Sequence, residues 1–172
     1  MAVDIQYQIS ATANFIVSVI ANYASKTNGS VAVVSNLFDL WNQSSQDSQK
    51  PMWYVCYAGE TPWSSDSNIS ALTHRVSRSW IVRVKQGRGF ASNRGDTLSN
   101  PVGNAGLFYN VVEHTRDLLR SMLGVSQDAG IDYEGIKPVR LGDQVIDCYD
   151  ISFSVKADMP NILPQPDDSL TN

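Results

Sequence analysis

The feature that most constrains this fold is a stripe of apolar side chains at helical spacing in residues 107–122. Polar and charged side chains fill the opposite side of the same stretch, so the pattern predicts an amphipathic helix of about four turns. Gly124 follows at a position where a helix favours a left-handed capping residue. The stripe consists of Phe108, Val111, Val112, Thr115, Leu118, Leu119 and Met122.

Residues 145–156 supply a surface on which such a helix can pack. Apolar and polar side chains alternate along this stretch, with the period of two that is typical of a half-buried strand. The apolar members are Tyr149, Ile151, Phe153 and Val155. Because an apolar helix side and an apolar sheet face bury each other, we expect an α+β fold. The expected architecture is a largely antiparallel twisted sheet of four to five strands, with two main helices packed on one face.

The same two periods define the rest of the chain. The strand expected at residues 52–57 is apolar on both faces, which places it in the centre of the sheet or at a covered interface. The other expected elements are a helix from Ile9 to Tyr23 stopped by Asn28-Gly29, a short apolar stretch at 31–34, a helical turn or two near Leu37, strands at 73–85 and 131–141, loops at 59–70 and 87–106, and a hairpin turn at Gly142-Asp143.

The chain of 172 residues is long enough for one domain with its own core. We assign that domain to residues 1–156. Residues 157–172 contain Pro160, Pro164 and Pro166 and few large apolar side chains, so they are expected to form an acidic tail that adds no strand to the sheet interior.

Cysteine usage and hydropathy favour a soluble protein of a reducing compartment. Cys56 and Cys148 lie inside expected strands without CxxC spacing, which indicates buried reduced thiols. Asp4 and the absence of a basic residue ahead of the first apolar run argue against a secretory signal. No apolar run approaches the roughly 20 residues that span a bilayer.

The net charge of −4 gives no general attraction to nucleic acid or anionic lipid, but the charge is unevenly distributed. Between positions 74 and 95 there are six basic residues and no acid. This run is interpreted either as the solvated face of a strand and its loop, or as a surface for an acidic partner, protein rather than DNA because aromatic residues are not interleaved with it. The basic residues are Arg75, Arg78, Arg83, Lys85, Arg88 and Arg94.

A search for reactive groups gives no catalytic or metal-binding pattern. Gly87-Arg88-Gly89 lacks the lysine and helix start of a phosphate loop. His114 has no second histidine four residues away, and Asp147 and Asp150 lie on opposite faces of one strand. We therefore expect no enzyme, no cofactor and no metal site.

The order of elements and several segments resemble the tail terminator (tail completion) proteins of long-tailed bacteriophages, the family of the lambda-like minor tail protein U. The resemblance spans nearly the whole chain. It is carried by residues 51–57, Trp80-Ile81-Val82-Arg83-Val84, residues 109–119, Ile131-Asp132-Tyr133-Glu134-Gly135-Ile136-Lys137-Pro138, residues 147–153 and Asp158-Met159-Pro160.

The resemblance implies a structural role in the virion, assembled in the host cytoplasm. Such proteins form a hexameric ring that caps the tail tube, ends its polymerisation and presents a surface to the head or neck connector. The implied partners are other copies of the chain, the tail tube protein and the neck proteins, with DNA passing only transiently through the ring and no membrane. The candidate interface residues are Arg83, Lys85, Arg88, Arg94, Trp53 and Tyr57.

Two alternatives remain open at this stage. One is a head completion or neck connector protein of the same virion. The other is a small enzyme or nucleic-acid-binding module that uses the basic loop 83–94, which would show steeply salt-dependent DNA binding.

Overall fold

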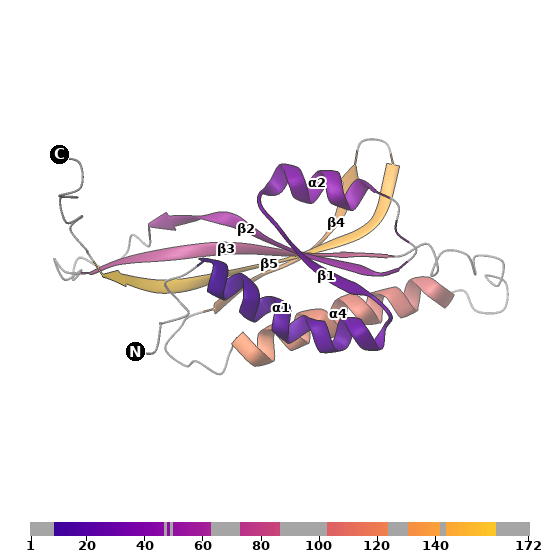
Figure 1. Cartoon of the computed structure of the whole chain (residues 1–172), viewed down its shortest axis with the longest axis horizontal. Helices are drawn as coiled ribbons and strands as arrows, with labels where there is room; N and C mark the ends of the chain where they lie inside the picture. The colour runs from indigo at the N-terminus through magenta and orange to yellow at the C-terminus, as the bar shows by residue number, and fades with distance from the viewer. Residues whose placement is uncertain are drawn as a thin grey trace, which may run out of the picture.

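A computed structural model describes residues 9–46, 48, 50–62, 73–86, 103–123, 131–141 and 144–160. Within them, one long twisted sheet lies between two helical layers of unequal size (Figure 1). The elements are α1 (Ile9–Lys26), β1 (Ser30–Val34), α2 (Leu37–Ser45), β2 (Met52–Pro62), β3 (Thr73–Lys85), α4 (Gly103–Leu123), β4 (Ile131–Leu141) and β5 (Gln144–Pro160).

The sheet has five strands in the order β1-β2-β3-β5-β4. β1 pairs with β2 in parallel, and the other three pairings are antiparallel. Two parallel neighbours need a crossover connection, and α2 lies in the crossover between β1 and β2. The expected α+β class with a largely antiparallel sheet is confirmed.

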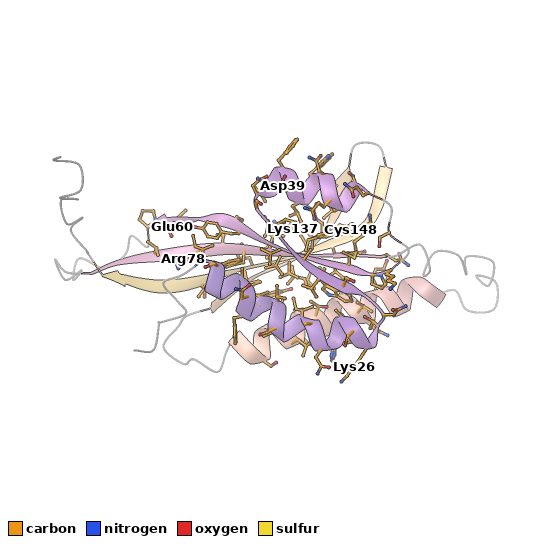
Figure 2. All side chains as sticks on the ribbon, in the orientation of Figure 1. Lys26, Asp39, Glu60, Arg78, Lys137 and Cys148 are labelled. Atoms are coloured by element: carbon orange, nitrogen blue, oxygen red, sulfur yellow. The ribbon has the colours of Figure 1, made fainter. Side chains whose placement is uncertain are left out.

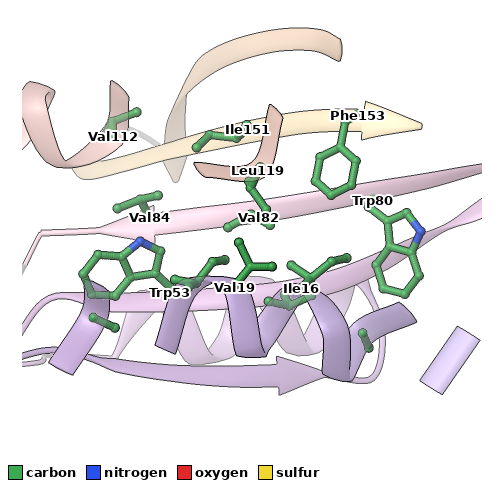
Figure 3. Close-up of a cluster of buried hydrophobic side chains, with 14 of the residues drawn as sticks. Ile16, Val19, Trp53, Trp80, Val82, Val84, Val112, Leu119, Ile151 and Phe153 are labelled. Atoms are coloured by element: carbon green, nitrogen blue, oxygen red, sulfur yellow. The ribbon is translucent and has the colours of Figure 1, made fainter. Parts of the chain in front are cut away.

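The main core lies between the sheet and the pair α1 and α4 (Figure 3). Alternate positions of β2, β3 and β5 point to this face, which is why the period of two in the sequence identifies them. Trp53 and Trp80 are its largest fully buried side chains. The helix stripe predicted at 107–122 is confirmed where it is described, because Val111, Val112 and Leu119 are buried in this core.

The end of α1 also follows from the sequence. Asn28 adopts a left-handed conformation with φ of 56°, and the amide of Gly29 donates to the carbonyl of Ala24 at 2.8 Å. A Cβ at Gly29 would lie 2.3 Å from Cζ3 of Trp53, so only glycine lets the chain pass this close to the core. The expected stop at Asn28-Gly29 is confirmed.

Three boundaries differ from the sequence prediction. β2 continues to Pro62, past a bulge at Gly59, into the stretch predicted as the loop 59–70. α4 begins at Gly103, inside the loop predicted at 87–106. β5 continues to Pro160, so placing residues 157–160 in the tail was wrong.

The reason for the last difference is the position of the proline within the sheet. Residues 157–160 of β5 pair with residues 73–76 of β3, whereas the described pairing of β4 with β5 ends at Val155. A proline is tolerated in a strand that has a neighbour on one side only, because an N–H that points away from that neighbour makes no ladder bond. The predicted tail beyond 160, the turn at 142–143 and the loop at 87–102 lie outside the described residues.

Helix α2 adds a second helical layer. From the sequence we expected only a helical turn or two near Leu37. α1 and α4 share one face of the sheet, as predicted, while α2 lies on the other (Figure 1). A small second core joins α2 to that face through Val34, Leu40, Tyr54 and Cys56. β2 is therefore central and covered on both sides, as its two apolar faces predicted.

Candidate protein-interaction surface

Trp53, an interface candidate from the sequence, belongs to the interior of the chain. Its exposed fraction is 0%, and its indole Nε1 donates to Thr115 Oγ1 at 2.9 Å. Thr115 in turn donates to the carbonyl of Val111 at 2.8 Å, so the pair ties β2 to α4. The expectation that the Trp53 side chain contacts a neighbouring subunit is wrong, because this side chain is fully buried in the main core of its own chain.

Tyr57, the second aromatic candidate, is half-buried beside the same core. Its ring lies 5.4 Å from the ring of Trp80, centroid to centroid. Burial raises the pKa of its phenol, and the carboxylate of Glu60 raises it further. Tyr57 therefore combines a packing role with partial exposure, and its place in an interface stays a prediction.

Arg83 and Lys85 do not form the exposed basic face that the alternation suggested. Each is 7% exposed, and each side chain reaches the C-terminal end of α2, Arg83 at Ser44 and Lys85 at the capping residue Gln46. Arg83 donates from Nε and Nη2 to the two carboxylate oxygens of Asp150 at 2.7 and 2.9 Å, and from Nη1 to Ser44 Oγ at 2.8 Å. The Lys85 ammonium donates to the carbonyl of Gln46. The prediction that both side chains face solvent is corrected.

The local field keeps Arg83 charged despite its burial. Desolvation alone would lower its pKa, but the hydrogen bonds and negative charge of Asp150 outweigh it and raise the pKa. Such a pair, with both partners on neighbouring strands, is internally neutralised. It therefore offers little to a phosphate backbone, which removes Arg83 from the nucleic-acid alternative.

The other two basic candidates, Arg88 and Arg94, lie outside the described residues. Of the remaining basic run, Arg78 is also buried, with Nε donating to Glu60 Oε2 at 3.2 Å. Figure 2 shows Arg78 and Glu60 together on the long strands, away from α2. Their ion pair joins β2 to β3.

A surface that the sequence did not single out lies on α2, the helix that packs over β1 and β2. Three large apolar side chains are exposed there, and the most exposed is Phe38 at 72%. They lie at positions i, i+1 and i+4 of α2, so they share one side of the helix. We call Leu37, Phe38 and Trp41 the β1–α2 surface. Val33 is also exposed, but it pairs with Val55 and so projects from the opposite face of the sheet, where α1 and α4 pack.

The opposite side of α2 is held firmly on the sheet. Leu40 is fully buried, and the hydroxyl of Tyr54 donates to the carbonyl of Gln43 at 3.1 Å. Asn36 caps the helix, since its Oδ1 accepts from the Asp39 amide at 2.9 Å and its Nδ2 donates to the Asp39 carboxylate at 3.0 Å. The outward direction of Phe38 and Trp41 is therefore fixed by contacts on the inward side.

Sequence reasoning found this helix but not its orientation. Leu37, Phe38 and Trp41 look like an inward apolar stripe, whereas the buried positions are Leu40 and Ser44. The sequence carried a weak indication of the true orientation. Leu40 and Ser44 are four residues apart and therefore share one side of the helix, and a serine hydroxyl can be buried when it accepts a hydrogen bond from an arginine. Nothing in the sequence identifies Arg83 as that arginine.

A second, smaller set of exposed aromatic side chains lies at the other edge of the sheet. Tyr133 on β4 and Tyr109 on α4 are both substantially exposed. The guanidinium carbon of Arg120 lies 5.6 Å from the ring centre of Tyr133, and Tyr109 packs edge to face on Tyr149 at 5.8 Å. We call Tyr109, Arg120 and Tyr133 the β4–α4 surface.

The groups with potential chemistry occupy structural positions. Cys56 and Cys148 are free and buried, and burial raises the pKa of the Cys56 thiol. His114 is an exposed helix residue at the margin of the apolar stripe, with its ring 4.3 Å from that of Tyr23. Among the described residues, no three His, Cys, Asp or Glu side chains are grouped to hold a metal ion. No described helix has the length and apolar character to cross a bilayer.

Comparison with known proteins adds no assignment. No protein-family model matches this chain, and no curated protein matches it in sequence. The geometry of the surfaces therefore carries the functional argument.

Proposed function

We propose that this chain is a structural virion protein of a long-tailed bacteriophage, which caps the tail tube as a homo-oligomeric ring. In this role it ends tube polymerisation and forms the interface to the head or neck connector. The resemblance of the sequence to tail terminators supports this role, and so does the α+β fold. The observation that carries it is the β1–α2 surface, an apolar surface on a short helix that is itself firmly anchored.

An exposed cluster of this kind indicates an interaction surface. Single exposed apolar residues are ordinary, but contiguous apolar area of a few hundred Å² marks sites of association. Leu37, Phe38 and Trp41 occupy one side of one helix, and each is about half exposed or more. An assembly protein uses such a surface directly, because its work is to hold neighbours in place.

The proposed mechanism is steric. A ring requires each copy to show two different surfaces to its neighbours, and the β1–α2 and β4–α4 surfaces lie on different elements. A closed ring on the end of the tube would cover the sites to which the next tube subunits add. The opposite side of the ring would then remain for the neck proteins.

Electron microscopy of particles assembled without this chain tests the proposal. We expect overlong tail tubes, because polymerisation would have no stop. A rescue with the wild-type chain should restore uniform length, whereas Phe38→Gln/Trp41→Gln should not. Tails of normal length that lack heads would contradict capping and indicate a neck connector instead.

A further inference from the structure

We propose that the β1–α2 surface of one copy binds the β4–α4 surface of the next copy, head to tail. The inference rests on the proposed function for the assembly in which it operates. The contact itself is argued from where exposed side chains lie on the sheet.

Apart from Ile9 and Val33, the exposed large apolar residues of the described chain fall into two sets, one on α2, which packs over β1 and β2, and one on β4 and α4. β1 and β4 are the two edge strands of the sheet. A two-fold contact would pair one set with itself and leave the other uncovered, whereas a head-to-tail contact covers both.

The exposed apolar area of the β1–α2 surface fits the centre of an interface. A large aromatic side chain buries about 150–250 Å², so Leu37, Phe38 and Trp41 together offer roughly 350 Å² of apolar area at their observed exposure. A stable interface needs about 800 Å² from each partner. The apolar cluster is therefore large enough to form the centre of such an interface, with the surrounding polar side chains as its rim.

The two surfaces also carry complementary chemical groups. Asp39 is the only charged residue of α2, and Figure 2 places it on the side of the molecule that α2 covers. On the other surface, Arg120 lies over an exposed tyrosine ring in the last turn of α4. Arg120 can pair with a carboxylate or stack on the ring of Phe38 or Trp41, and tyrosine and tryptophan are the residues that favour interfaces.

Two variants with one surface removed from each test the contact. Phe38→Gln/Trp41→Gln removes the β1–α2 surface and keeps good helix formers in α2. Tyr109→Gln/Tyr133→Thr removes the β4–α4 surface and keeps a β-branched residue in the strand. Circular dichroism and thermal melting establish that both variants fold, and Ile9→Gln serves as the matched loss of an exposed apolar side chain outside both surfaces.

Sedimentation equilibrium gives the expected result. The wild type and Ile9→Gln should associate beyond the dimer as concentration rises, and each double variant alone should stay monomeric. An equimolar mixture of the two double variants should form a one-to-one pair and grow no further, because it contains one intact head and one intact tail.

Several outcomes would overturn the contact. These are a mixture that stays monomeric, a double variant that associates like the wild type, or a wild type that is monomeric at about 1 mM, the weak limit of specific affinities. The result also separates the two proposals. Pairing in the mixture with tubes left uncapped by the wild type would retain the contact and reject the capping role. Normal capping by either double variant would reject the contact and retain the role.

Discussion

The three guanidinium nitrogens of Arg83 all donate hydrogen bonds within the chain. Two meet Asp150 on the neighbouring strand, and the third meets Ser44 on α2. A bidentate contact of this geometry is the strongest form of an arginine–carboxylate pair. Arg83 therefore acts as a bridge between the sheet and α2 rather than as a charge offered to a partner.

A double-mutant cycle on this pair should show strong coupling. Arg83→Met leaves the Asp150 carboxylate without its partner in a site where only 16% of its side chain is exposed. We expect a loss of about 3 kcal/mol in the free energy of unfolding, measured by urea denaturation, because an uncompensated buried charge is costly.

The reciprocal variant is the control for this prediction. Asp150→Leu alone should destabilise the fold by a similar amount, and Arg83→Met/Asp150→Leu should recover most of the loss, since the double variant leaves no unpaired charge. Additive losses in the double variant would show that the two side chains contribute independently and would contradict the bridging role.

At the scale of the element, α2 is unusual in having large apolar side chains on both sides. Leu40 fills the small core against Val34, Tyr54 and Cys56, while Phe38 points outward. Burial of the inward side stabilises the helix, and exposure of the outward side does not. Folding therefore does not account for the outward side, which under the proposed contact would bind the next copy.

Two truncations on this helix should separate the roles. Leu40→Ala removes a fully buried side chain and should lower the free energy of unfolding by about 2–5 kcal/mol. Phe38→Ala, two residues earlier, should change it by less than about 0.5 kcal/mol, since surface truncations away from special contacts are nearly neutral. Denaturation of both variants at a low protein concentration checks this, and equal losses would contradict the assignment of Phe38 to an exposed side that does not stabilise the fold.

The sequence was sufficient for the elements whose apolar pattern is regular. The helix at 107–122, the alternation of β3 and the two-faced β2 were all predicted, because one dominant core imposes one clear period. It was insufficient for the β1–α2 unit. There, five strand residues and nine helix residues carry too few positions to separate inward from outward apolar side chains.

The predicted basic surface failed for a different reason. Alternation shows that Arg83 and Lys85 share a face, but it does not show whether a helix covers that face. The hydrogen-bond partners of Arg83, Ser44 and Asp150, lie 39 and 67 residues away in the chain. Pairings at such separations have no local signal, so the burial of these charges and the orientation of the interaction surface were both missed.

For the whole molecule, the two layers differ in the amount of apolar surface they bury. Among the described residues, sixteen buried side chains form the core shared by α1 and α4, and four form the core under α2. Local opening requires least free energy where few apolar contacts are lost. The layer formed by α2 should therefore open while the rest of the molecule stays folded.

The thiol of Cys56 can report this opening, because it is buried in the small core and is inaccessible to a labelling reagent in the closed state. Burial also raises the pKa of the thiol, which disfavours the reactive thiolate there. The measurement uses a Cys148→Ser variant, in which Cys56 is the thiol to be labelled, at pH 8. At low urea concentrations, we expect the labelling rate to be nearly independent of urea. Leu40→Ala should raise this rate. The matched variant Val19→Ala lies in the main core and should leave that low-urea rate unchanged while lowering global stability. Labelling that follows global unfolding at every urea concentration would show that both layers open as one unit.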